Sequence, residues 1–312
     1  MSERANQPVS ITGGSGFIGS SVVDALVAAG HDVRVLDPHP PHRDDVDWRE
    51  VDVLDLDNLT KELDGSGPVF HLAAMADVND VIASPARATE VNVVGTVNVL
   101  EAARQADAGR VILASTVWVY DATRGERVDE TACFDPDTNR HLYVSTKIAA
   151  ELACRDYLNL YQRPFTVLRL GIPYGPRMRP TTVLASFFRR ALAGETLRID
   201  GDGRQVRNFV YVEDLAQAFV KALRPEAENA IINLNGPEPV SIRRLAELTQ
   251  ELVPGALVEF GPSRPGDLAP RVVISERAGE LLDWTPAVDI DEGVRRTFDW
   301  YVEAHADELR DV

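Results

Sequence analysis

The stretch Val9-Ser-Ile-Thr-Gly-Gly-Ser-Gly-Phe-Ile-Gly19 decides the fold of this chain. It begins with a short apolar run that ends in glycines, as a buried strand does, and the segment 17–29 that follows has a helical pattern. Between strand and helix, Gly13, Gly16 and Gly19 have the spacing G-x-x-G-x-x-G. Glycines at these places permit a tight turn, close approach of the backbone to a pyrophosphate, and close packing of the helix on the strand. The stretch therefore predicts the opening βα unit of a dinucleotide-binding sheet.

A carboxylate follows the second expected strand, Val33-Arg-Val-Leu36. At that place Asp37 would accept hydrogen bonds from the adenosine ribose hydroxyls and would repel a 2′-phosphate, so the sequence predicts NAD rather than NADP. The alternative is that Asp37 only begins a solvated loop. Asp52 and Val53, at the end of a third expected strand, are candidates for contact with the edge of the adenine.

Strands and helices alternate through the first half of the chain. Further strands are expected at 68–72, 110–115 and 165–170, and further helices at 86–104 and 142–160. Such alternation predicts an α/β fold, a Rossmann-like doubly wound parallel sheet covered on both faces.

The pattern changes after about Gly171. Helices are then expected at 181–193, 214–222, 242–252 and 290–304, with short strands at 231–234 and 257–260. We therefore expect an NAD-binding domain over residues 1–171 and a smaller C-terminal lobe over residues 172–312. Segments near 205–235 are candidates to rejoin the first domain.

The composition restricts the kinds of partner. The formal net charge is −17, from 32 basic and 49 acidic residues, and so acidic a surface repels nucleic acids and anionic membranes. The two cysteines, Cys133 and Cys154, give neither a disulfide framework nor a metal-ligand spacing. No signal-like segment and no long apolar run occurs, so a soluble, cytoplasmic protein is expected. Only three basic residues are lysines, which fits either a GC-rich coding bias or adaptation to high salt.

Tyr143 and Lys147 lie four residues apart in the expected helix 142–160, and so on one face of it. An unperturbed tyrosine titrates near about 10 and is a poor base at neutral pH. A nearby ammonium group lowers the pKa of the phenol and lets it accept a proton. The pair therefore indicates acid–base catalysis, with an ordinary surface Tyr/Lys pair as the alternative.

Together, these motifs resemble the extended short-chain dehydrogenases/reductases, in the NAD-dependent epimerase/dehydratase family of nucleotide-sugar enzymes. The resemblance covers nearly the whole chain. The matching pieces are Thr12–Gly19, His71-Leu-Ala-Ala74, Asn92, Ser115-Thr-Val-Trp-Val-Tyr120, Tyr143-x-x-x-Lys147, Tyr174-Gly-Pro-Arg177, Gly201-Asp-Gly-x-x-x-Arg207 and Arg264-Pro-Gly-Asp267.

The resemblance implies a catalytic group of three residues. Tyr143 would be the base, Lys147 would hold the nicotinamide ribose and lower the pKa of Tyr143, and Thr116 would bond the reacting sugar hydroxyl. The NAD contacts that it implies are Gly13, Gly16, Phe17, Ile18, Gly19, Asp37, Asp52, Val53, Leu72, Ala73, Ala74, Asn92, Tyr143, Lys147 and Pro173.

The residues after Thr116 separate the possible reactions. Dehydratases and decarboxylases of this family usually carry an acidic residue there, whereas this chain has Val117 and Trp118, which cannot accept a proton. The resemblance therefore implies a 4-epimerase that acts through a transient 4-keto sugar, with Trp118 as a wall of the sugar pocket. A 4,6-dehydratase, a decarboxylase, an oxidoreductase and a non-catalytic NAD-binding protein are the alternatives.

The substrate is expected to be a nucleotide-diphosphate sugar, with a UDP-sugar favoured. Arg207 and Arg264 match the residues that bind the diphosphate, and Asp267 lies near the nucleoside ribose in the resemblance. Surface ion pairs are the alternative for both arginines, and Arg177 and Arg179 are further candidates. Ile172 and Asn208 depart from the family pattern, which leaves the sugar open. The resemblance also implies that the lobe over residues 172–312 mainly binds substrate, and that a homodimer forms through the helices 86–104 and 142–160.

Overall fold

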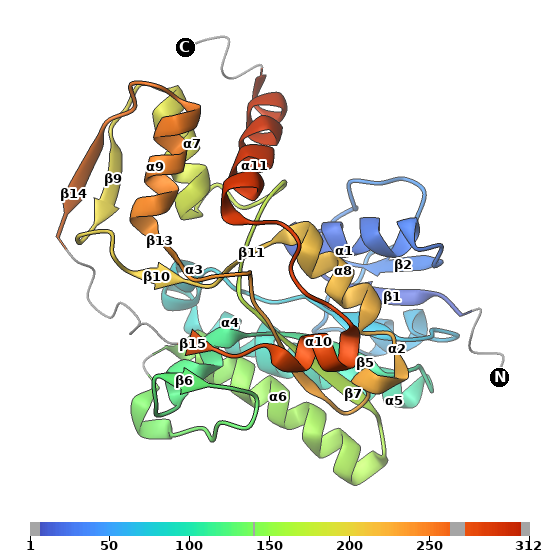
Figure 1. The fold of residues 1–312 in the computed structure, drawn as a ribbon. Coiled ribbons are helices and arrows are strands. Elements are labelled where there is room, and N and C mark those ends of the chain that lie inside the picture. Colours follow the sequence, from blue (N-terminus) through green and yellow to red (C-terminus); the bar gives the residue numbers. More distant parts are fainter. Residues whose placement is uncertain (1–6, 140, 263–271, 307–312) are drawn as a thin grey trace.

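The computed structural model describes residues 7–139, 141–262 and 272–306 (Figure 1). Its centre is a seven-stranded sheet in the order β12-β7-β5-β4-β1-β2-β3, and each neighbouring pair is parallel. Its strands are β1 (Val9–Thr12), β2 (Val33–Leu36), β3 (Asp47–Arg49), β4 (Val69–His71), β5 (Val111–Thr116), β7 (Phe165–Leu170) and β12 (Ile231–Leu234). The expected doubly wound α/β fold is confirmed.

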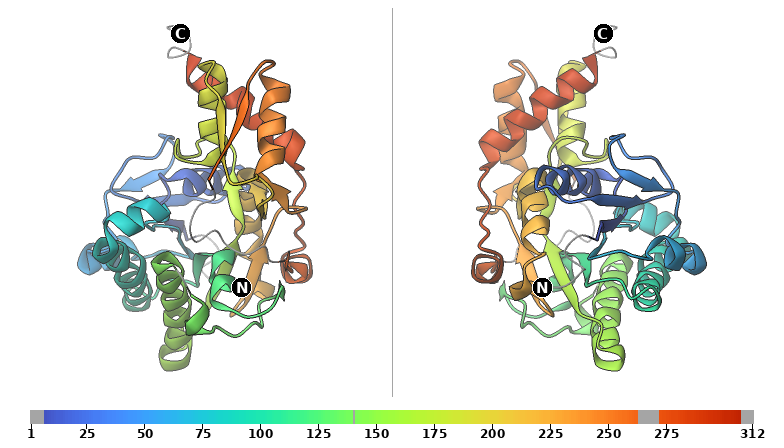
Figure 2. Two further views of the ribbon diagram at one scale, coloured as in Figure 1. Left: turned by 90° about the vertical axis from the view of Figure 1, so that its left-hand side faces the viewer. Right: turned by 90° about the vertical axis from the view of Figure 1, so that its right-hand side faces the viewer.

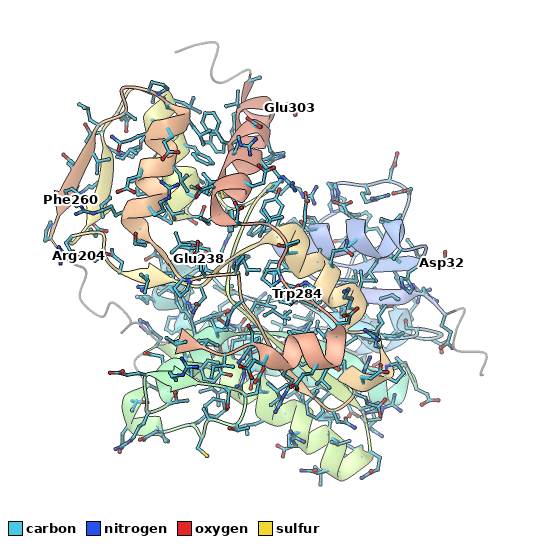
Figure 3. All side chains as sticks on the ribbon, viewed as in Figure 1. Asp32, Arg204, Glu238, Phe260, Trp284 and Glu303 are labelled. Carbon is cyan, nitrogen blue, oxygen red and sulfur yellow. The ribbon has the colours of Figure 1, made fainter. Side chains whose placement is uncertain are left out.

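Helices cover both faces of this sheet, which explains why β5 and β7 are buried along their whole length. One face lies under α1 (Phe17–Ala28), α8 (Val212–Lys221) and α10 (Glu276–Leu282). The other lies under α2 (Leu56–Glu62), α5 (Gly95–Gln105) and α6 (Leu142–Tyr161). Trp284 lies between α8 and α10 (Figure 3), and its indole donates to the carbonyl of Asp214 over 2.9 Å.

The chain reverses its direction of travel across the sheet between β1 and β4. β2 and β3 follow β1 on one side, and β4, β5, β7 and β12 follow on the other. Parallel sheets bind ligands at the carboxyl ends of their strands at such a point. The glycine stretch lies there: Gly13 has φ +75°, and a Cβ built on it would lie 2.5 Å from the backbone nitrogen of Ala73, just after β4.

The C-terminal lobe has a core of its own and stands at the top of the view in Figures 1 and 2. Aromatic rings fill it, and Tyr174 packs edge-on against Phe209 and Tyr211 with ring centroids 6.2 and 5.6 Å away. Its helices are α7 (Val183–Leu192), α9 (Ile242–Leu252) and α11 (Ile290–Ala304). Its short strand pairs are β9 (Leu197–Asp200) with β14 (Val258–Gly261), β10 (Val206–Arg207) with β13 (Val240–Ser241), and β8 (Ile172–Tyr174) with β11 (Phe209–Tyr211).

The remaining described elements are short. They are α3 (Val78–Ala83), α4 (Pro85–Thr89), the π-helical η2 (Glu90–Val94), the 3₁₀ turns η3 (Val117–Ala122), η4 (Pro136–Thr138) and η5 (Pro225–Ala227), and the strands β6 (Arg127–Val128) and β15 (Val272–Val273). The expected helix 86–104 therefore includes a π-helical turn, and α2, α3 and α10 were not predicted because each spans only six or seven residues.

The main sheet contains residues from both sides of the expected domain boundary at 171. β12 pairs with β7 along its whole length, and the adjoining α8 packs against α1. The strand 231–234 was expected in the C-terminal part of the chain, but a segment of four apolar and polar residues does not reveal its pairing partner. The division into 1–171 and 172–312 stays a prediction.

Gly19→Ala should lower the free energy of unfolding by about 1–3 kcal/mol, because a Cβ there would lie 2.0 Å from the carbonyl oxygen of Gly13 and the backbone would have to move. Gly279→Ala is the matched control, a helical glycine in α10 with no atom within 4 Å of the added Cβ. It should raise stability by about 0.5–1 kcal/mol, since alanine favours helix. Urea unfolding of both variants measures the difference, and similar effects would contradict the prediction.

Candidate active site

The glycine stretch forms the turn between β1 and α1. The N–H of Gly16 donates to the carbonyl of Gly13 over 3.2 Å, and Gly16 caps α1 without any side-chain hydrogen bond. The first turn of α1 carries no acidic side chain. The positive end of the helix and its backbone N–H groups therefore suit a pyrophosphate, which fits the predicted contacts at Gly13, Gly16 and Gly19.

Asp37 lies directly beside this turn. Its Oδ2 accepts from the backbone N–H of Ser15 over 3.1 Å, and its Oδ1 accepts from that of His39 over 3.0 Å. The carboxylate is buried and joins the glycine turn to the loop after β2. The arrangement places an acceptor where the sequence expected the adenosine ribose, and that ribose contact stays a prediction.

The third strand is shorter than expected, and Asp52 does not stand at its end. β3 stops at Arg49, and Asp52 lies in the loop that leads to α2, where its Oδ1 accepts from the N–H of Leu54 over 3.0 Å. The strand ends early because all three residues of β3 are exposed at the sheet edge. Val53 is buried against Gly95 of α5. Contact of Asp52 and Val53 with adenine stays a prediction.

A buried histidine connects the glycine turn to the helix behind it. His71 lies at the end of β4, with Nδ1 2.7 Å from the hydroxyl of Thr12 and Nε2 3.0 Å from the hydroxyl of Thr96. Burial lowers the pKa of His71 to about 3, so the imidazole is neutral at physiological pH. The residues that follow, Leu72, Ala73 and Ala74, are half-buried, and backbone atoms of Leu72 and Ala73 lie beside Gly13 of the glycine turn.

The side chain of Asn92 links the segment after β4 to α6. Its Oδ1 accepts from the N–H of Met75 over 2.8 Å, and its Nδ2 donates to the carbonyl of Met75 and to the hydroxyl of Thr146 on α6, at 3.0 and 3.1 Å. The amide therefore holds α6 at a set distance from the segment after β4. Its expected contact with the cofactor stays a prediction.

The expected catalytic residues come together at the carboxyl end of β5. Thr116 ends the strand, and Tyr143 and Lys147 reach it from the first two turns of α6; all three side chains are buried. The Lys147 ammonium donates to the carbonyl of Ala114 over 2.9 Å. Burial lowers the pKa of Lys147 to about 8, while the charge of Glu151 acts against that shift.

The expected lowering of the pKa of Tyr143 by Lys147 does not hold among the protein groups. Burial raises the pKa of Tyr143 to about 12, and the groups that oppose this rise are Arg179 and a hydrogen bond with Thr116. The physical reason is the apolar shell around the phenol. This shell consists of Met75, Ala76, Val81, Ala88 and Trp118.

The positions after Thr116 carry no acid or base. Val117 is buried, and Trp118 is half-buried with its ring edge-on to that of Tyr143, 6.2 Å between centroids. The ring of His141, just before α6, lies 6.4 Å from that of Trp118. An aromatic wall therefore stands beside the phenol, as the sequence expected for Trp118.

The expected substrate contacts in the lobe are only partly described. Arg207 is half-buried on β10, and one of its guanidinium nitrogens donates to the carbonyl of Val206 over 2.9 Å. Pro173 lies in β8 and pairs with Val210 of β11. Arg264 and Asp267 lie outside the described residues. The substrate contacts expected of Arg207, Arg264 and Asp267 stay predictions, and so does the NAD contact expected of Pro173.

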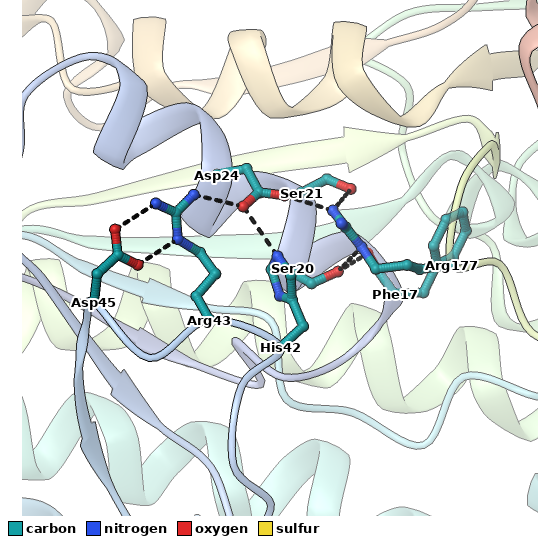
Figure 4. A network of polar contacts seen from close by, with 8 residues as sticks. All are labelled: Phe17, Ser20, Ser21, Asp24, His42, Arg43, Asp45 and Arg177. Carbon is teal, nitrogen blue, oxygen red and sulfur yellow. Dashed lines mark hydrogen bonds and ion pairs between the residues drawn. The ribbon is translucent and has the colours of Figure 1, made fainter. Parts of the chain in front are cut away.

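The two further arginine candidates have different surroundings. Arg177 bonds to α1, where its guanidinium donates to Ser20 and Ser21 and pairs with Asp24 at 2.7 Å (Figure 4). Asp24 also pairs with Arg43, so this group fastens the loop after β8 to the first helix. Arg179 is half-exposed, lies 3.8 Å from Asp77, and acts electrostatically on Tyr143.

Sequence reasoning missed two charged residues beneath Lys147, which are Glu151 and Arg169. Glu151 continues the spacing of Tyr143 and Lys147 by one more helical turn, so all three share a face of α6. Arg169 is a charged residue inside the apolar strand β7 and is only 2 % exposed. A buried charge needs a partner, and this was the signal in the sequence.

Comparison with known proteins identifies the family of this chain. A model of the NAD dependent epimerase/dehydratase family matches residues 9–234. A UDP-glucose 4-epimerase from Mycolicibacterium smegmatis is 34% identical, over 93% of this chain and 97% of that protein.

Two solved structures have the same fold. A UDP-glucose 4-epimerase from Thermotoga maritima with UDP-glucose has a TM-score of 0.86 at 30% identity, covering 95% of this chain and 99% of that one. A dTDP-glucose 4,6-dehydratase from Streptomyces venezuelae with NAD bound has a TM-score of 0.88 at 27% identity, covering 97% and 99%. The family match, the relative and the site geometry agree, and the chain belongs to the NAD-dependent epimerase/dehydratase family of the extended short-chain dehydrogenases/reductases.

Proposed function

We propose that the protein is a nucleotide-sugar 4-epimerase that uses NAD and acts on a UDP-sugar through a transient 4-keto intermediate. The observation that carries this proposal is the meeting of Thr116, Tyr143 and Lys147 beside the glycine turn, followed by Val117 and Trp118, which hold no second acid or base. Relatives named as UDP-glucose and UDP-glucuronate 4-epimerases support it.

In the proposed reaction, Tyr143 takes the proton of the sugar C4 hydroxyl while Thr116 bonds the same oxygen. Bound NAD supplies the redox chemistry, because it accepts the hydride from C4 and gives it back. After the keto sugar has turned, Tyr143 returns the proton to the new C4 hydroxyl, so no atom is gained or lost. The apolar shell of Met75, Val81 and neighbouring side chains keeps water from the phenol.

The phenol must be made more acidic for this role. A pKa of about 12 lies about 5 units above neutrality, and at about 1.4 kcal/mol per unit the phenolate needs roughly 7 kcal/mol of preferential stabilisation. We propose that the ammonium of Lys147 and the positive nicotinamide of bound NAD together would supply this stabilisation within the low-dielectric pocket. The charged state of Lys147 is therefore a condition of the proposed activity.

The acidic surface agrees with an anionic substrate only if local cations bind its diphosphate. We assign this role to Arg207, Arg264 and the half-exposed Arg179, with Asp267 near the nucleoside ribose. We also place the protein in the cytoplasm. No helix in the described part of the chain is long and apolar enough to cross a membrane.

We further propose a homodimer formed by α5 and α6. These neighbouring helices expose large apolar side chains to solvent, with Val97, Leu152 and Leu160 between 37% and 70% exposed. Apolar patches of this kind on adjacent helices are typical of association surfaces. A second copy would cover them by pairing the same helices around a two-fold axis.

The purified enzyme should convert a UDP-hexose into its 4-epimer without added cofactor and without net reduction of NAD. NMR of UDP-, dTDP- and GDP-sugars incubated with the protein identifies the product. A 4-keto-6-deoxy sugar would instead support a dehydratase, released CO₂ a decarboxylase, and stoichiometric NADH an oxidoreductase. No turnover with any sugar while NAD stays bound would support a non-catalytic NAD-binding protein.

Tyr143→Phe should reduce turnover by about 10²–10⁴-fold while NAD binding is retained, because only the proton acceptor is lost. Tyr157→Phe is the matched control, on the same helix, where the phenol bonds Glu101 at 3.1 Å and lies outside the catalytic group. It should leave turnover within about twofold. Substantial activity in the Tyr143 variant would reject the role proposed for this residue.

Leu152→Glu should yield a monomer, because it places a charge in the proposed α5–α6 interface. Leu257→Glu changes an equally apolar side chain that is 68% exposed in the lobe, and it should leave the dimer intact. Light scattering is the measurement, with about twice the chain mass of 34.3 kDa expected for the wild type. A wild-type mass of one chain would reject the dimer.

A further inference from the structure

A carboxylate lies one helical turn beyond Lys147, away from solvent. Glu151 is 5% exposed and accepts from the hydroxyl of Ser115 over 2.5 Å and from two nitrogens of Arg169 at 2.7 and 3.0 Å. Ser115 directly precedes Thr116 at the end of β5. The carboxylate therefore joins the catalytic helix to the two strands beneath it, next to two of the catalytic residues.

Arg169 is held on every side. Its remaining guanidinium nitrogen donates to the hydroxyl of Tyr120 over 2.9 Å, and that hydroxyl donates to Asn233 of β12 over 2.8 Å. The rings of Tyr120 and Phe134 lie 5.0 and 5.4 Å from the guanidinium carbon. Such a bidentate, enclosed pair leaves neither side chain room to move.

A buried ion pair adds little to the free energy of unfolding. Loss of hydration offsets most of the attraction, and apolar pairs of similar volume are often equally stable. The placement of this pair suggests a different use. Its negative end faces Lys147, and the charge of Glu151 favours the ammonium form of that lysine against the effect of burial.

We propose that Glu151, fixed by Arg169 and Ser115, is a positioning residue that keeps Lys147 charged and directed into the active site. This inference rests on the proposed function, in which the ammonium stabilises the phenolate of Tyr143. Glu151 itself touches neither substrate nor cofactor in this role. It acts through Lys147, and Arg169 acts through Glu151.

The other groups around Lys147 do not replace this charge. The titratable groups that face it are Tyr143, Glu151 and Cys154 from α6, His71 from β4, and, behind Glu151, Arg169 from β7 and Tyr120 from η3. Burial keeps the phenol of Tyr143 and the imidazole of His71 neutral, and it raises the pKa of Cys154 to about 12. Glu151 is therefore the only anion in this described set.

These groups determine the direction in which the pKa of Lys147 shifts when the charge of Glu151 is removed. Burial already lowers the pKa of Lys147 to about 8, and Glu151 opposes the shift. Removing the negative charge makes the ammonium harder to keep, so the pKa of Lys147 falls further. The charged lysine is then lost at a lower pH, and the alkaline limb of turnover moves in the same direction.

The scarcity of lysine makes a direct test practical. Labelling with [ε-¹³C]lysine gives three NMR signals, and Lys61→Arg and Lys221→Arg assign the one from Lys147. In the wild type this signal should titrate near about 8. In Glu151→Gln its midpoint should fall by about one unit or more, as the loss of a close opposite charge requires. An unchanged midpoint would overturn the proposal.

Two further variants separate charge from packing. Ser115→Ala removes one hydrogen bond but keeps the carboxylate, so the Lys147 midpoint should stay near the wild-type value. The double variant Glu151→Leu with Arg169→Met replaces the pair by apolar side chains of similar size and should fold. Its Lys147 midpoint should fall as in Glu151→Gln, and a wild-type midpoint in this folded variant would show that the pair only holds the fold together.

The NMR titration does not depend on turnover, so the two proposals can fail separately. A lowered Lys147 midpoint in a protein that epimerises no sugar would retain the role of Glu151 and reject the proposed function. In an active enzyme, the pH at which kcat declines should shift by the same amount as the NMR midpoint. A decline that does not move with the midpoint would overturn the link between Glu151 and catalysis.

Discussion

The structure depends on a turn between β1 and α1 that has no room for a Cβ at Gly13 or Gly19. A Cβ on Gly13 would lie 2.5 Å from the backbone of Ala73, and a Cβ on Gly19 would lie 2.0 Å from the carbonyl of Gly13. Because the turn fits this closely, α1 begins at the carboxyl end of β1, where the order of the strands in the sheet reverses. β5 pairs with β4, so Thr116 lies at the same edge of the sheet, and α6 brings Tyr143 and Lys147 to that edge.

Burial has the same effect on three different groups at this site. It raises the pKa of Tyr143 to about 12, lowers that of Lys147 to about 8 and lowers that of His71 to about 3, so each neutral form gains. Neutrality suits His71, which only bridges two hydroxyl groups. The neutral form does not suit Lys147, because the proposed reaction needs its ammonium. Of the three residues, Lys147 has a carboxylate, that of Glu151, one helical turn further along α6.

The sequence predicts what is local, and the structure supplies what is not. The strands β1, β2, β7 and β12 and the helices α9 and α11 match their expected bounds, because apolar periodicity records their burial directly. The pairing of β12 with β7 and the partner of Arg169 could not be predicted, since both join residues far apart in the chain. The pKa of Tyr143 was misjudged because the neighbouring lysine is visible in the sequence, whereas the apolar shell comes from four other segments.

The residues after Thr116 explain why, in the proposed reaction, the keto sugar would be reduced again and would not undergo elimination. Elimination from a keto sugar needs a second group to move a proton, and Val117 and Trp118 offer none next to Thr116. The half-buried ring of Trp118 presents a largely apolar wall, on which the indole N–H is the one hydrogen-bond donor. In the proposed reaction, such a wall would hold neither face of the sugar strongly. Proton transfer would then rest on Tyr143 and Thr116, which can serve the C4 oxygen whichever face of the sugar is turned to them.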